Sequence, residues 1–277
     1  MLKNLGKKKE IVAAESEEKE MSFLEHLEEL RWHIFRSVLS ILVISIVIFL
    51  FKDLVVSIMF APRYNDFVTH KFLCDHLEVH CEVNQFKMFT SAMGEEFITH
   101  LTTSLWLGLM FSIPYIFWEI WRFIKPGLYE SERKAARGMV AVCSLLFFIG
   151  VLFGYFIIAP FAFNFLAGYS FGESNEATVS LSSYIGYLVM LTVPVGVIFE
   201  LPIMCYVLGK IGVLTSSFMK NYRRHAIVII FIIGAVISPP DLPSQLLIAF
   251  PLLLLYELSI SIVKRIEKKN AKELAKG

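Results

Sequence analysis

The sequence has few charged residues for a chain of its length, and that scarcity restricts what the protein can be. Asp, Glu, Lys and Arg make up 18% of the 277 residues, whereas hydrophobic residues make up 56%. Soluble domains carry about a quarter charged residues and about half apolar ones. No polar stretch between the apolar runs is long enough for a soluble core, and only the segment 52–96 approaches that length. These features exclude an ordinary soluble protein.

The sequence also lacks the motifs of common catalytic and metal sites. It contains no P-loop of the GxxxxGK(S/T) type and no HExxH zinc motif. Its four cysteines form no metal-binding pattern, and Cys143 and Cys205 lie in apolar stretches where cysteine packs as a small hydrophobe. An intramembrane enzyme would need a nucleophile–base pair, but His33 and His100 are isolated near the ends of apolar stretches. We therefore expect no enzyme activity, cofactor, metal ion or nucleic-acid partner.

Long apolar stretches dominate what is present. A helix needs roughly 20 residues to cross about 30 Å of hydrocarbon. Six stretches are candidates: about 32–51, 97–118, 138–159, 182–208, 226–238 and 243–263. The third should end at Ala159, because Pro160 disrupts a helix. The fifth is short, since its charge-free run of 15 residues spans only about 22 Å. We predict an all-α polytopic membrane protein with six transmembrane helices in a lipid bilayer.

The basic residues predict the orientation. Of 26 Lys and Arg residues, 22 precede the first stretch or lie in its first turns (Arg36), follow the sixth, or lie between stretches two and three or four and five. The other side holds only Lys52, Arg63, Lys71 and Lys87. Because Lys and Arg are retained in the cytoplasm, both termini should be cytoplasmic.

The termini differ from the membrane domain in composition. Residues 1–21, rich in Lys and Glu, predict a disordered cytoplasmic tail, and 264–277 a basic cytoplasmic tail. The membrane domain between them spans 22–263. Ser22 and Glu25 form a capping-box pattern, which predicts an amphipathic helix along the cytoplasmic surface before the first stretch.

Several acidic residues are candidates for a functional site. Glu200 lies in an apolar stretch between Pro194 and Pro202, where a carboxylate is costly unless it is protonated, hydrated or paired. The prolines favour a water-lined concavity, and the alternative is a structural acid that is hydrogen-bonded to a neighbouring helix. On the cytoplasmic side, Glu132 lies near Phe123 and Glu29 precedes Arg31. Such carboxylates could bind a guanidinium group bidentately, or could simply be solvated.

Two cysteines lie on the opposite side of the membrane. Cys74 and Cys81 belong to the long segment 52–96, in a compartment where disulfides persist. They could form a disulfide or remain two separate thiols.

Five short motifs follow one another along the chain. They are His26-Leu-Glu-Glu-Leu-Arg31, Ala61-Pro62, the segment WRFIKPGLYESER at 121–133, Phe199-Glu-Leu-Pro202, and Ser238-Pro-Pro-Asp241 with Ser244-Gln245. In this order they resemble the TatC family of twin-arginine translocase subunits, over about residues 22–263. The segment 64–86 looks longer than usual in that family.

The resemblance implies a fold and a function. The fold would be a glove-shaped bundle of six helices with short fifth and sixth helices. The protein would be the receptor and core subunit of twin-arginine export in the bacterial inner membrane. It would bind the signal peptides of folded proteins, assemble with single-span TatA/TatB-type partners into an oligomeric complex, and use the proton-motive force.

The resemblance also implies roles for individual residues. The signal-peptide site would comprise Glu132, Phe123 and Glu29, with support from Arg31 and Pro62. Glu200 would be the polar residue of a concave face, and partner helices would dock at Ser238 and Gln245. An ion-coupled secondary transporter with an intramembrane Glu is the alternative. It would carry internal repeats, and the two halves of the chain share no motif.

Overall fold

The computed structural model describes residues 23–77, 86–124, 138–169, 178–238 and 242–274. The elements are α2 (Phe23–Leu50), α3 (Lys52–Phe60), a 3-10 turn (Ala61–Arg63), α4 (Val68–Leu77), β1 (Lys87–Phe89), α5 (Glu95–Ile124), α7 (Met139–Phe153), a π-helical segment (Gly154–Ile158), α8 (Ala159–Gly168), β2 (Thr178–Ser180), α9 (Leu181–Ile198), α10 (Leu201–Lys210), α11 (Ser216–Asn221), α12 (Arg223–Ile237) and α13 (Leu242–Leu274).

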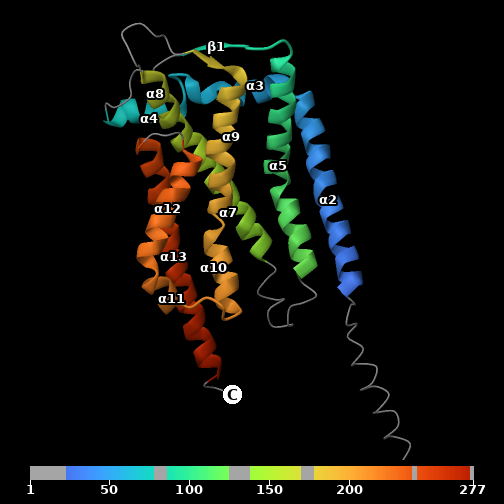
Figure 1. The fold of residues 1–277 in the computed structure, drawn as a ribbon, viewed down its shortest axis with the longest axis vertical. Coiled ribbons are helices and arrows are strands. Elements are labelled where there is room, and N and C mark those ends of the chain that lie inside the picture. The colour runs from blue at the N-terminus through green and yellow to red at the C-terminus, as the bar shows by residue number, and fades with distance from the viewer. Residues whose placement is uncertain (1–22, 78–85, 125–137, 170–177, 239–241, 275–277) are drawn as a thin grey trace, which may run out of the picture.

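The long helices stand roughly side by side (Figure 1). α2 packs on α5 at one edge, α13 packs on α10 and α12 at the other, and α7 packs on α9 between them. We call the end with α3, α4 and β1 the upper end, and the end where α2 begins and α13 finishes the lower end.

Five helical stretches of the described chain are long and apolar enough to cross a membrane. They are Leu27–Leu50, Glu95–Ile124, Met139–Gly168, Leu181–Lys210 and Leu242–Ala271. α12, the predicted fifth span, has 15 residues, or about 22 Å of helix, which is shorter than the hydrocarbon core. The predicted all-α polytopic membrane fold is confirmed. The last helix is longer than we expected, because α13 continues without a break past Val263 through its charged end to 33 residues.

The start of the chain also differs from the expectation. α2 is one continuous helix of 28 residues, so the described residues that were predicted to form a separate surface helix are the first turns of the span itself. No Gly or Pro interrupts this sequence, so nothing turns the chain between its polar first turns and its apolar remainder. Glu29 therefore stands on the membrane-crossing helix itself, at its lower end.

The third span does not end at Ala159. A π-helical segment follows α7 and leads directly into α8, which continues to Gly168. Pro160 is the second residue of α8 and has no N–H to donate to the preceding turn. The π-helical segment therefore absorbs the proline without ending the span.

Glycines allow α7 and the π-helical segment that follows it to approach α9 closely. A Cβ atom at Gly154 would lie 2.5 Å from the carbonyl oxygen of Leu191, and one at Gly150 would lie 2.8 Å from the Cα atom of Gly196. Small residues at helix contacts increase van der Waals packing where apolar burial from water is unavailable. This contact holds the centre of the bundle.

An aromatic cluster and two strands join the segments at the upper end. Tyr184 on α9 is 1% exposed, stacks on Phe163 with ring centroids 4.6 Å apart, and donates a hydrogen bond to the carbonyl of Met59 at 3.0 Å. β1 and β2 pair in parallel, with Lys87 opposite Thr178. Strands of three residues carry too little periodicity to be predicted from sequence.

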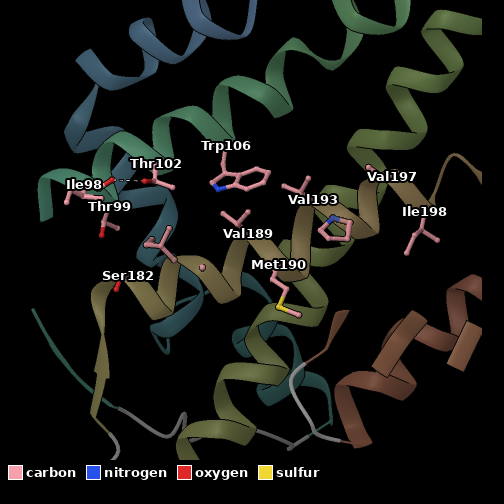
Figure 2. Close-up of a pocket in the computed structure, with 13 residues that line it drawn as sticks. Ile98, Thr99, Thr102, Trp106, Ser182, Val189, Met190, Val193, Val197 and Ile198 are labelled. Carbon is pink, nitrogen blue, oxygen red and sulfur yellow. Dashed lines mark hydrogen bonds between the residues drawn. The ribbon is translucent and has the colours of Figure 1, made fainter. Parts of the chain in front are cut away.

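A pocket of about 730 Å³ opens between α5 and α9 (Figure 2). Trp106 on α5 points toward Val189 and Val193 on α9. The Glu200 carboxyl is not part of its lining.

Candidate functional site

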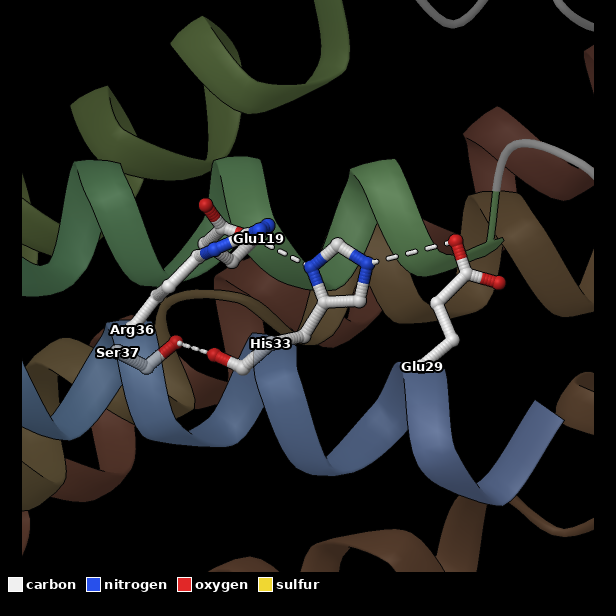
Figure 3. A network of polar contacts seen from close by, with 5 residues as sticks. All are labelled: Glu29, His33, Arg36, Ser37 and Glu119. Atoms are coloured by element: carbon white, nitrogen blue, oxygen red, sulfur yellow. Dashed lines mark hydrogen bonds and ion pairs between the residues drawn. The ribbon is translucent and has the colours of Figure 1, made fainter. Parts of the chain in front are cut away.

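At the lower end, α2 and α5 bring together two of the residues predicted for the signal-peptide site. Glu29 lies on α2 and Phe123 lies near the end of α5, and His33 on α2 contacts both side chains. Figure 3 shows the His33 ring with Glu29 on one side and Glu119 on the other. His33 Nε2 is 3.9 Å from Glu29 Oε1. Its ring lies edge-on to the ring of Phe123, with centroids 5.9 Å apart. One imidazole therefore contacts both predicted residues.

The other nitrogen of His33 contacts a second acid. His33 Nδ1 is hydrogen-bonded to Oε2 of Glu119 on α5, and each residue is only 5% exposed. The Arg36 guanidinium is 3.9 Å from the same carboxylate oxygen. A buried carboxylate needs such partners, because burial without them is costly. The hydroxyl of Ser37 donates to the His33 carbonyl at 2.9 Å.

Sequence reasoning missed His33 and Glu119. It treated His33 as isolated and gave Glu119 no role in the site. A signal was nevertheless present, because Glu29 and His33, like Glu119 and Phe123, are four residues apart on a helix and so share a face. What the sequence did not reveal is that these two faces meet.

The other residues predicted for this site lie elsewhere. Glu132 is outside the described residues. Arg31 is exposed, with its guanidinium 5.9 Å from the Trp32 ring centroid. Pro62 is buried in the 3-10 turn at the upper end, where its carbonyl contacts His70 Nε2 at 3.3 Å. The 21 helical steps from Glu29 to Leu50 on α2 span about 32 Å, so the structure does not bring Pro62 to the group.

Glu200 lies in the turn that separates α9 from α10. It is 8% exposed, and its Oε1 atom has no hydrogen-bond partner within the described chain. The thiol of Cys143 on α7 lies beside this carboxyl group. The break follows from Pro202, which cannot donate a helical hydrogen bond. The acid is thus held against α7, in the interior of the bundle.

Ser238 and Gln245 lie where α12 meets α13. Gln245 Nε2 donates to the carbonyl of Phe231 at 3.0 Å, so this side chain ties the two helices together. Ser238 ends α12 and is 4% exposed, and its hydroxyl has no partner among the residues described. The Gln245 amide is therefore hydrogen-bonded within the α12–α13 hairpin, whereas the Ser238 hydroxyl has no such bond among the described residues.

The cysteines fall into two pairs, one inside the bundle and one in the segment between the first two spans, as the sequence suggested. Cys143 and Cys205 are free thiols inside the bundle. Cys74 on α4 is disulfide-bonded. Its predicted partner Cys81 lies outside the described residues, so their pairing stays a prediction.

Comparison with known proteins gives consistent matches over most of the chain. A family model described as Sec-independent protein translocase protein (TatC) matches residues 25–251. The Sec-independent protein translocase protein TatC of Aquifex aeolicus is 37% identical over 258 residues, covering 93% of this chain and 100% of that protein. The TatC protein of a Blattabacterium species is 35% identical over 266 residues, covering 92% and 99%.

A solved structure matches as well. The crystal structure of a twin-arginine translocase receptor, TatC, superimposes with a TM-score of 0.69 at 36% sequence identity. The match covers 88% of this chain and 100% of that one.

Proposed function

Because the chain belongs to the TatC family of Sec-independent protein translocase proteins, we propose that it is the receptor subunit of a twin-arginine export system. It is a multi-pass membrane protein with a role in protein translocation. The proposal adds the ligand and its place: the protein binds signal peptides with paired arginines, which folded proteins carry, at the lower end of α2 and α5.

The observation that carries the proposal is the contact of His33 with both Glu29 and Phe123. The Glu29 side chain is 36% exposed and can meet a peptide. Its distance of 3.9 Å from His33 exceeds the hydrogen-bond range of about 2.7–3.2 Å, so its oxygens can still accept from a donor. The planar guanidinium group fits a carboxylate bidentately, which an ammonium group does not.

Glu132 would complete this site from the neighbouring segment of the chain. α5 ends at Ile124 and α7 begins at Met139, so both ends of the segment that contains Glu132 are fixed near the lower end. Two carboxylates, one from each segment, would match two adjacent guanidinium groups. Phe123 would cover the apolar part of the peptide beside them.

Crosslinking tests this assignment. A photoreactive amino acid at position 123 should capture a twin-arginine signal peptide in purified membranes, and should capture much less of a twin-lysine peptide. The matched control is the same photoreactive residue at Val68, which is exposed at the upper end. Equal capture at both positions, or equal capture of both peptides, would reject the site.

The remaining features fit the same proposal. Both termini would be cytoplasmic and the membrane would be the bacterial inner membrane, so the lower end would face the cytoplasm. Single-span TatA/TatB-type partners would dock near Ser238 and Gln245, and the oligomeric complex would use the proton-motive force. Glu200, whose buried Oε1 atom has no hydrogen-bond partner among the described residues, would act in the later step of partner assembly.

A further inference from the structure

The lower end of the bundle carries cations around α11 and α13 that the fold does not use. α11 packs on α12 and α13, and α13 continues below the ends of α10 and α12 (Figure 1). Four basic residues here are exposed and have no ion-pair partner among the residues described. These four, which we call the basic cluster, are Lys220, Arg224, Lys264 and Arg265.

The acids at this end are already bonded within the fold. The Arg223 guanidinium contacts Glu257 through Nε to Oε1 and through Nη2 to Oε2, each at 2.9 Å. Glu267 Oε1 accepts from the backbone N–H of Ser216 at 2.7 Å, and its Oε2 atom accepts from the Ser216 hydroxyl. Glu257 and Glu267 are the acids with described side chains in α11, α12 and α13. The basic cluster therefore keeps its positive charge.

α11 is held against α13, which brings the cations of the two segments to one place. The Tyr256 hydroxyl on α13 donates to the Met219 carbonyl on α11 at 2.8 Å, and Met219 is 4% exposed. Lys220 follows Met219 in the chain, and Lys264 and Arg265 lie within nine helical steps of Tyr256. Nine steps correspond to about 14 Å of helix. The cluster is thus a local concentration of charge on packed helices.

Large apolar side chains are exposed beside the cluster. Ile211 and Val213, which follow α10, are 64% and 72% exposed. On α11 and directly after it, the rings of Phe218 and Tyr222 are about half exposed and lie 4.5 Å apart. Lys220 lies between these two residues in the sequence. Exposed apolar and aromatic residues next to Lys and Arg are typical of a segment in the headgroup layer of a membrane.

The height of the cluster in the bundle also fits the headgroup layer. α12 begins at Arg223 and has only 15 residues, so its ends cannot extend far beyond the hydrocarbon core. Lys264 directly follows the uncharged run that ends at Val263 on α13. Both segments therefore place their cations where a span ends.

We propose that the basic cluster, with Phe218 and Tyr222, binds phospholipids whose headgroup carries a net negative charge, as that of phosphatidylglycerol does. The cations contact the headgroup phosphates, and the two rings pack on the adjoining part of the acyl chains. The charges favour an anionic over a zwitterionic headgroup, because both acids beside the cluster are bonded within the fold. The exposed apolar residues favour a lipid over an acidic soluble protein, because they lie where the leaflet covers them. This surface is separate from the site on α2 and α5.

Native mass spectrometry of the full chain, titrated with lipid in a non-ionic detergent, tests the proposal. The probes are phosphatidylglycerol and phosphatidylcholine with identical acyl chains. Wild type should bind phosphatidylglycerol more tightly than phosphatidylcholine. The double variant Lys220→Gln/Arg224→Gln should bind phosphatidylglycerol about thirtyfold more weakly, since each cation near the headgroups contributes about fivefold. Lys264→Gln/Arg265→Gln should have a similar effect, and it tests the surface independently if the first variant fails to fold.

The matched control removes two exposed lysines at the upper end. Lys52→Gln/Lys71→Gln changes the net charge by the same amount but leaves the basic cluster intact, so phosphatidylglycerol binding should stay near the wild-type value. Equal affinity of wild type for the two lipids would overturn the proposal, as would a folded cluster variant that binds like wild type or a control that loses as much affinity. A photoreactive residue at Phe218 should capture lipid in native membranes, and predominant capture of a protein there would also overturn it.

Discussion

His33 on α2 and Glu119 on α5 form a buried hydrogen-bonded pair through Nδ1 and Oε2. This contact fixes the orientation of the imidazole. Its other nitrogen faces Glu29 (Figure 3), and its ring makes a T-shaped contact with the ring of Phe123. A side chain outside the predicted recognition residues thus holds two of them in place. The pair joins the two helices that meet at the lower end.

The first prediction concerns this pair. His33→Ala should lower thermal stability, because it removes the histidine partner from the buried Glu119 carboxylate; breaking a buried pair costs about 3–5 kcal/mol. Adding Glu119→Leu should recover part of that loss. Thermal unfolding of the single and double variants in one detergent measures the coupling. Additive losses would contradict a direct contact.

The second prediction concerns the recognition acids. Glu29→Ala and Glu132→Ala should each weaken binding of a twin-arginine signal peptide by about ten- to a hundredfold, since each removes a charged hydrogen bond. Each should also reduce the preference for twin arginine over twin lysine. Peptide affinity in purified membranes measures both. Glu28→Ala is the control, because Glu28 is exposed and adjacent in sequence but points from another face of α2. Unchanged discrimination in both variants would place the site elsewhere.

The third prediction concerns the contact between α9 and the π-helical segment that follows α7. Gly154→Ala would place a Cβ atom 2.5 Å from the carbonyl oxygen of Leu191, so the helices must separate. Overpacking of this kind costs about 1–3 kcal/mol, and the melting temperature should fall. Gly186→Ala has open space and should leave it nearly unchanged. Equal melting temperatures for the two variants would contradict the close helix contact.

The fourth prediction concerns Glu200. Glu200→Gln keeps the shape and hydrogen-bonding capacity of the side chain beside Cys143, and should retain the fold and signal-peptide binding. Glu200→Leu should bind the peptide but impair recruitment of partner subunits. Export of a folded substrate, measured alongside peptide binding, separates the two steps. Export at the wild-type rate by Glu200→Leu would show that the acid is only structural.

The fifth prediction concerns topology. A reporter that is active only outside the cytoplasm should be active when fused after Asp75 or Ser174, and silent after Arg133 or Lys268. The reason is the split of basic residues, 22 on one side and four on the other. Activity after Arg133 would reject the arrangement with both termini in the cytoplasm.

Much of this protein follows from its sequence alone. Length and apolarity determine which segments can cross a bilayer, because a helix must satisfy its own backbone hydrogen bonds there. The same reasoning identified the short α12 from its charge-free run and the interior acid Glu200 from its apolar neighbours. Both features depend only on residues that are near one another in the sequence, so the sequence is enough to predict them.

The tertiary structure decided which faces meet. Pro160 does not end the third span, because a π-helical segment precedes it. Pro62 lies outside the predicted site, because about 32 Å of α2 separates it from Glu29. His33 gained a role only because α2 packs on α5 with Glu119 opposite it. Helical spacing assigns a residue to a face, but the partner of that face depends on how helices distant in sequence pack. That choice is made by close contacts such as the one at Gly154, which no local pattern encodes.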